Sequence, residues 1–163
     1  MSNMIIEKNL IDINEKKPAK RIDIVTLKMV KENSITYSNR VISSPADSAD
    51  IISDFIEDCD REQMIVCCLD TKNQPTSISV VSIGSLNSAI VHPREVYKTA
   101  IMSNASSIII AHNHPSGNNE PSHEDITLTN RLDEAGKIIG IKLLDHLIIG
   151  YGSFYSFKEE GML

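Results

Sequence analysis

His112 and His114 stand at the end of an apolar run, and Asp125 follows in the next segment of the chain. Residues i and i+2 of an extended strand point to the same face, so both imidazoles are expected on one side. Pro115 favours an extended His114, and residues 116–119 are typical of a turn that sends the chain back. Two neutral imidazoles and one carboxylate form the three-ligand set of a catalytic zinc, whose fourth position is left to water.

Glu62 and Ser122 are the candidates for two further roles that hydrolysis at a carbonyl requires. These roles are a general base beside the water and a donor for the oxyanion that develops. Each residue also has a simpler explanation. Ser122-x-x-Asp125 is a helix-capping pattern, and Glu62 alone is typical of a solvated strand end. The residues by themselves leave both explanations open.

The elements that must position these residues are predicted from hydrophobic periodicity and turn residues. Short apolar runs predict strands at 63–69, 77–83, 107–111, 141–149 and 153–157. A further hairpin is predicted from 22–30 and 35–41, and helices are predicted at 44–59, 93–103 and 122–137. About three helices and seven strands without an internal repeat indicate an α+β fold.

The composition is that of one folded domain, with 163 residues and 41% hydrophobic residues. A flexible tail is expected at 1–21 and the domain at 22–163. The net charge of -6 and the aromatic content of 4% argue against nucleic-acid binding. Neither a membrane span nor a signal peptide is predicted, so we expect no membrane association, a cytoplasmic location, and reduced thiols at Cys59, Cys67 and Cys68.

The arrangement H-x-H-x7-S-x2-D, formed by His112, His114, Ser122 and Asp125, resembles the signature of the JAMM (MPN+) metalloprotease family. The stretch HPSG from His114, together with residues 92–96 and 144–146, resembles the RadC branch of bacterial JAB-domain proteins. This resemblance covers roughly residues 22–160. It implies a JAB/MPN-like (cytidine-deaminase-like) fold, a mixed sheet flanked by about three helices.

The resemblance also implies a role for each site residue. His112, His114 and Asp125 would bind Zn²⁺, Glu62 would be the general base, and Ser122 would hydrogen-bond the oxyanion. The implied activity is that of a zinc-dependent metallopeptidase or isopeptidase. Its partner would be a peptide or protein substrate, including isopeptide-linked conjugates, and the oligomeric state is left open.

Two other classes of function stand as alternatives. One is a DNA repair-associated or DNA-binding RadC-type protein, and the other is a catalytically idle protein-interaction module. Asp145 and His146 are interpreted either as groups that orient a ligand imidazole or as a local structural contact. Arg94 and Glu95 are interpreted as an ion pair at a helix start or as a substrate contact.

Overall fold

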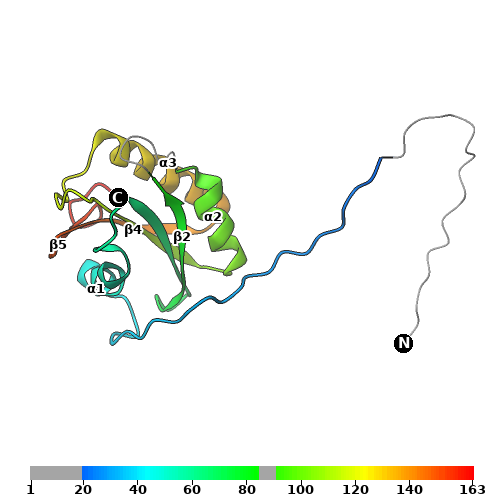
Figure 1. The fold of residues 1–163 in the computed structure, drawn as a ribbon, viewed down its shortest axis with the longest axis horizontal. Helices are drawn as coiled ribbons and strands as arrows, with labels where there is room; N and C mark the ends of the chain where they lie inside the picture. The colour runs from blue at the N-terminus through cyan, green and yellow to red at the C-terminus, as the bar shows by residue number, and fades with distance from the viewer. Residues whose placement is uncertain (1–19, 85–90) are drawn as a thin grey trace, which may run out of the picture.

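The computed structural model describes residues 20–84 and 91–163, which contain a five-stranded mixed sheet lying between two layers of helix (Figure 1). The elements follow in the order α1 (Pro45–Ile56), β1 (Gln63–Leu69), β2 (Pro75–Ile83), α2 (Pro93–Met102), β3 (Ser107–Asn113), α3 (His123–Ile139), β4 (Lys142–Gly150) and β5 (Ser153–Ser156). The strand order is β2-β1-β3-β4-β5, in which β3 and β4 are parallel and the other neighbours are antiparallel. The predicted α+β class with three flanking helices is confirmed.

The helices begin and end at the signals that the sequence carries. Ser44 caps α1 by accepting from the backbone N–H of Asp47, whose carboxylate accepts from the backbone of Ser44 in return. Pro45 occupies the first helical position, where its missing N–H costs nothing. At the C-terminal end of α3, Gly140 closes the helix in the left-handed conformation, with φ 81°.

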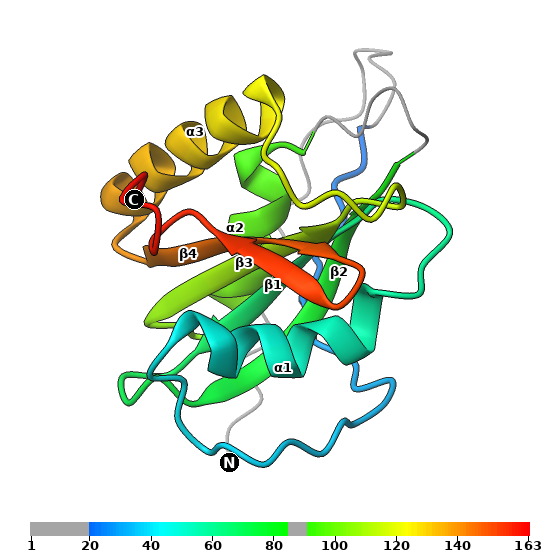
Figure 2. The ribbon, with the colours of Figure 1, turned by 90° about the vertical axis from the view of Figure 1, so that its left-hand side faces the viewer.

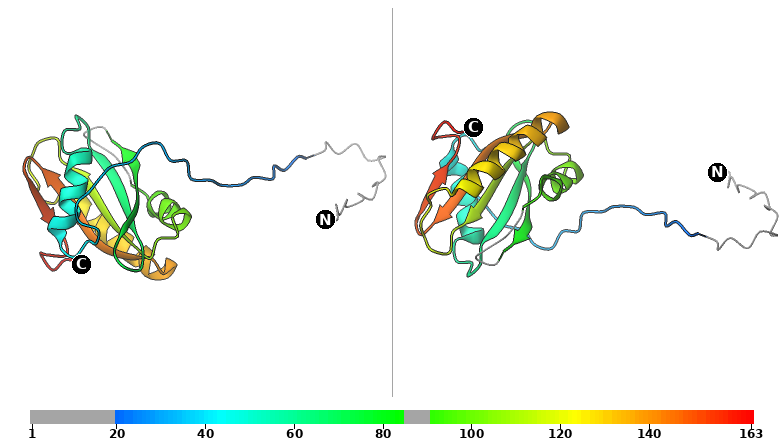
Figure 3. Two further views of the ribbon diagram at one scale, coloured as in Figure 1. Left: turned by 90° about the horizontal axis from the view of Figure 1, so that it is seen from below. Right: turned by 90° about the horizontal axis from the view of Figure 1, so that it is seen from above.

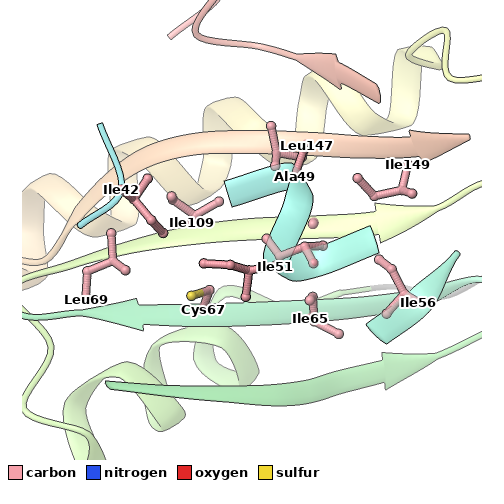
Figure 4. Close-up of a cluster of buried hydrophobic side chains, with 12 residues drawn as sticks. Ile42, Ala49, Ile51, Ile56, Ile65, Cys67, Leu69, Ile109, Leu147 and Ile149 are labelled. Carbon is pink, nitrogen blue, oxygen red and sulfur yellow. The ribbon is translucent and has the colours of Figure 1, made fainter. Parts of the chain in front are cut away.

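The sheet buries apolar side chains on both faces, and helices lie over each face (Figure 2). Helix α1 covers one face, and its side chains pack against residues of β1, β3 and β4 (Figure 4). Helices α2 and α3 cover the other face. Neighbouring cysteines of β1 are divided between the two layers, because Cys67 faces α1 and Cys68 faces α2 and α3. Both thiols are free, as is that of Cys59.

One irregularity in β4 decides which way its side chains point. The pairing of β3 with β4 shifts between Ile108 and Ile109, which leaves Leu144 as an extra residue on β4. A bulge of this kind reverses the alternation of side chains beyond it. His146 pairs with Ile110, whose side chain belongs to the layer of α2 and α3. The side chain of His146 is therefore turned toward α3.

The predicted hairpin over 22–30 and 35–41 is wrong. These residues contain neither helix nor strand, and much of the segment extends away from the rest of the domain (Figure 3). The sheet in the described part of the chain has five strands instead of seven. Alternating apolar residues favour a strand, but a strand forms only where a partner strand supplies hydrogen bonds. Within residues 20–84 and 91–163, no strand pairs with this segment.

Residues 1–19 of the predicted tail lie outside the described residues. Among residues 20–84 and 91–163, no helix has the length and apolar character needed to cross a membrane.

Candidate metal centre

The three predicted metal ligands meet where β3 ends and α3 begins. The Nε2 atoms of His112 and His114 lie 3.0 Å apart. Nε2 of His112 lies 3.2 Å from Oδ1 of Asp125, and Nε2 of His114 lies 3.7 Å from Oδ2 of the same carboxylate. One ligand atom from each of the three residues lies within 4.8 Å of the other two. His112 is buried and His114 is partly open to solvent.

Ser122 caps α3 and fixes the carboxylate of Asp125. Its hydroxyl donates to Oδ2 of Asp125 at 2.6 Å and accepts from the backbone N–H of Asp125 at 3.1 Å. The backbone N–H of Ser122 donates to the same Oδ2 atom at 2.8 Å. The capping interpretation is thus confirmed. The cap also places the Ser122 hydroxyl directly beside a predicted ligand.

The antiparallel pairing of β1 with β3 brings the start of β1 to the histidines. Met64 pairs with His112, and Glu62 directly precedes β1, so continuing the same register would place Glu62 opposite His114. The pKa of His114 is raised, mainly by the neighbouring carboxylate of Asp125 and to a smaller extent by the negative charge of Glu62. The carboxylate of Glu62, which is not one of the three donors, is therefore close enough to influence His114 electrostatically.

Asn113, between the two histidines, anchors the segment that carries Glu62. Its Oδ1 accepts from the backbone N–H of Gln63 at 2.8 Å. Its Nδ2 donates to the carbonyl oxygens of Cys59 at 3.2 Å and Arg61 at 3.1 Å. Asn113 was not among the residues predicted from the sequence, although the alternation in H-x-H already implies that the middle side chain points to the opposite face.

A chain of buried hydrogen bonds connects α3 to His112. Oγ1 of Thr129 lies 2.6 Å from the carbonyl oxygen of Asp125 and 2.6 Å from Nδ1 of His146. Nε2 of His146 lies 2.9 Å from Nδ1 of His112. Thr129 was not predicted from the sequence, and the signal that indicates it is its position one helical turn after Asp125.

The hydrogen positions in this chain follow from what each group can donate. A carbonyl only accepts, so the single hydroxyl hydrogen of Thr129 goes to Asp125, and Thr129 accepts from Nδ1–H of His146. Burial lowers the pKa of His146 well below its usual value, so its ring is neutral and its Nε2 is an acceptor. His112 must then donate through Nδ1–H. The remaining lone pair of His112 is on Nε2, which faces His114 and Asp125.

His114 is held in the corresponding tautomer by the turn that follows it. Its Nδ1 lies 2.7 Å from the carbonyl oxygen of Asn118, which only accepts, so Nδ1 carries the hydrogen. Gly117, with φ 80°, lets the chain turn back at this point. The neutral ring therefore also presents a lone pair on Nε2.

Lone pairs of two imidazoles and one carboxylate thus converge on a single point. Acceptors at such separations repel one another unless a proton or a metal ion lies between them. Burial raises the pKa of Asp125, but the neighbouring imidazoles of His112 and His114 and the hydroxyl of Ser122 outweigh burial and hold the pKa well below its usual range. The carboxylate is therefore ionised, and the group is suited to a cation.

The structure shows the contacts of two further pairs of residues that were interpreted from the sequence. Asp145 accepts from the hydroxyl of Ser156 at 2.6 Å and from the backbone N–H of His146 at 2.7 Å, so it is a local structural contact. His146 itself contacts a predicted ligand, as described above. Arg94 and Glu95 form an exposed ion pair of 3.3 Å at the start of α2.

Fold and site together define an α+β domain with a His-His-Asp group that could hold a metal ion. Comparison with known proteins agrees, because the family described as "RadC-like JAB domain" matches residues 42–162. The chain belongs to this RadC-like JAB domain family.

Relatives are found in both bacteria and archaea. The chain is 52% identical over 128 residues to a UPF0758 protein of Clostridium acetobutylicum, a match covering 78% of this chain and 56% of the relative. It is 45% identical over 151 residues to a UPF0758 protein of Methanosarcina mazei, covering 93% of this chain and 66% of the relative. The matched region thus spans between about half and two thirds of the length of these relatives.

Proposed function

We propose that this domain is a zinc-dependent hydrolase of peptide or isopeptide bonds, with His112, His114 and Asp125 as the metal ligands. The observation that carries the proposal is the convergence of three lone pairs, with the tautomer of each histidine set by a hydrogen bond on its other nitrogen. Ligating histidines in proteins are oriented in this way.

The donor set fits a tetrahedral zinc ion. With Zn–N distances of about 2.0–2.1 Å, neighbouring ligand atoms of a tetrahedron lie about 3.3 Å apart. The separations in this group are 3.0, 3.2 and 3.7 Å. Three protein ligands leave the fourth position for water, which is the arrangement of catalytic zinc sites and not of structural ones.

When bound, zinc would supply a Lewis acid and lower the pKa of a water molecule. Glu62 would accept a proton from that water and deliver it to the leaving amine. The hydroxyl of Ser122 would turn from Asp125 and donate to the oxyanion. A peptide or protein is the substrate class that this chemistry serves.

Metal analysis of the purified protein tests the ligand assignment. One zinc per chain is expected, together with its loss in His112→Ala while circular dichroism reports a folded chain. Another metal in place of zinc, or full zinc retention in the folded variant, would reject the assignment.

Glu62→Gln tests the proposed general base. Because the amide cannot accept the proton, turnover should fall by about 10²- to 10⁴-fold while zinc stays bound. Cleavage is measured on a peptide library and on isopeptide-linked conjugates, with Glu124→Gln as the control because Glu124 is an exposed glutamate of α3. Unchanged hydrolysis in Glu62→Gln would reject the role of this residue.

A further inference from the structure

Residues 22–30 form an apolar segment that extends away from the folded part of the chain (Figure 1 and Figure 3). The exposed fractions of Ile22 and Ile24 are 91% and 100%. Close to the body, the Ser103 hydroxyl at the end of α2 donates to the sulfur of Met29 at 3.5 Å. Ordered apolar residues are normally buried, because burial offsets the entropy lost on ordering. This segment therefore has the character of a strand without its partner.

The outer edge of β2 has the complementary character of a strand that lacks a neighbour. This strand is outermost in the sheet, and within residues 20–84 and 91–163 no strand pairs with its free edge. Exposed edges are usually protected by charged residues, yet the sequence PTSISVVSI contains none. Pro75 protects only the first residue of the edge. Val80 and Ile83 are exposed at 41% and 60%.

We propose that residues 22–30 of one copy pair with the edge of β2 in a second copy, and that the exchange is reciprocal. Each five-stranded sheet would gain one strand from its partner. A reciprocal exchange of this kind closes with two-fold symmetry and leaves neither segment unpaired. The segment runs away from its own sheet (Figure 1 and Figure 3), so in this conformation the available edge belongs to another molecule.

Three features of the segment match this position. It has nine residues, as β2 has. It carries five β-branched side chains, which favour strands. A strand added to a sheet with helices on both faces should also be apolar on both sides. The apolar residues divide between the two sides of the segment, with Ile22, Ile24 and Val30 on one and Val25, Leu27 and Met29 on the other.

Sedimentation analysis of the full chain over a range of concentrations tests the exchange, together with amide hydrogen exchange. A dimer is expected, with slow exchange at residues 22–30 and 75–83. In an antiparallel pair, successive N–H groups point to opposite sides, so one of the single variants Val25→Pro and Thr26→Pro must remove an inter-strand hydrogen bond. That variant should be monomeric and should lose the slow exchange at 22–30. Glu32→Pro, at an exposed position outside the segment, should remain dimeric.

Neither proline lies in the folded body, so the body should keep its melting temperature and a loss of dimer can be read directly. A monomer at all concentrations would overturn the proposal. A monomer with slow exchange at 22–30 would overturn it as well, because the segment would then pair with its own β2. A dimer that survives both Val25→Pro and Thr26→Pro would show that another surface holds the copies together, which also overturns it.

Discussion

Thr129→Val is expected to weaken zinc binding, although Thr129 contacts neither of the two ligand imidazoles. The Thr129 hydroxyl is the acceptor that keeps the hydrogen of His146 on Nδ1, and His146 in turn keeps the hydrogen of His112 on Nδ1. Valine has nearly the shape of threonine, so the substitution removes the acceptor without opening a cavity. The effect should therefore come from hydrogen positions alone.

The magnitude follows from one unpaired donor. In the variant, leaving the buried Nδ1–H of His146 without an acceptor costs about 1–3 kcal/mol. The metal-free chain avoids this cost by moving the hydrogen of His146 to Nε2, which makes His112 accept on Nδ1 and carry its own hydrogen on Nε2. Zinc binding must reverse this change and bear its cost. Since about 1.4 kcal/mol is tenfold, the Kd for zinc should rise by about 5- to 140-fold.

The Kd is measured by competition with a chromophoric zinc chelator, and nitrogen NMR of the imidazoles reports the tautomers. Thr127→Val is a matched control, because Thr127 donates to the carbonyl of His123 at 2.9 Å in the same helical geometry but faces solvent. The control should bind zinc as the parent does. Equal Kd values for Thr129→Val and the parent, or unchanged tautomers in the metal-free variant, would refute the reasoning.

Three further substitutions test the cap of α1, the packing of α3 and the role of the second cap. The pKa of Asp47 is lowered from 3.8 to about 2, chiefly by the side-chain hydrogen bond from Ser43, so this carboxylate stabilises the fold above pH 3.8 and loses that contribution as the pH falls through about 2. Asp47→Asn should therefore lower stability at pH 6 and show a smaller loss on acidification than the Asp50→Asn control, as urea unfolding at each pH can measure. Gly136→Ala should lower the melting temperature, although alanine favours a helix over glycine by about 1 kcal/mol. The reason is that the added Cβ would lie 2.6 Å from the backbone oxygen of Ile141. A higher melting temperature would contradict this packing. Ser122→Gly should cost only a few tenths of a kcal/mol as a cap but reduce turnover by about 10²- to 10³-fold if the hydroxyl serves the oxyanion, so normal turnover in a stable variant would leave Ser122 as a cap alone.

The sequence predicted the parts of the site whose geometry is local. The spacing of His112 and His114 fixes their common face, and the capping pattern of Ser122 fixes where Asp125 enters α3. It also indicated the start of β1, whose Met64 pairs with His112. Each of these relations depends on alternation or on one helical turn, and both can be counted along the chain.

The hydrogen-bond chain behind His112 could not be predicted in this way. His146 faces α3 only because the extra residue Leu144 reverses the alternation of β4, and a single extra residue leaves no mark in an apolar run. Thr129, in α3, is important because its hydroxyl contacts Nδ1 of His146 in β4. Such contacts depend on register between distant segments, which periodicity does not specify.

The predicted hairpin was wrong for a related reason, because an apolar pattern indicates a segment suited to a strand but does not identify its partner strand. Residues 63–69 and 22–30 both have apolar side chains on both sides, but in the described part of the chain only the first segment has strand neighbours. Alternation therefore records that a segment suits a sheet, without recording which sheet. The strand-like segment 22–30 lacks a partner strand, and the unprotected edge of β2 lacks a neighbouring strand. Pairing between two copies of the chain would supply both.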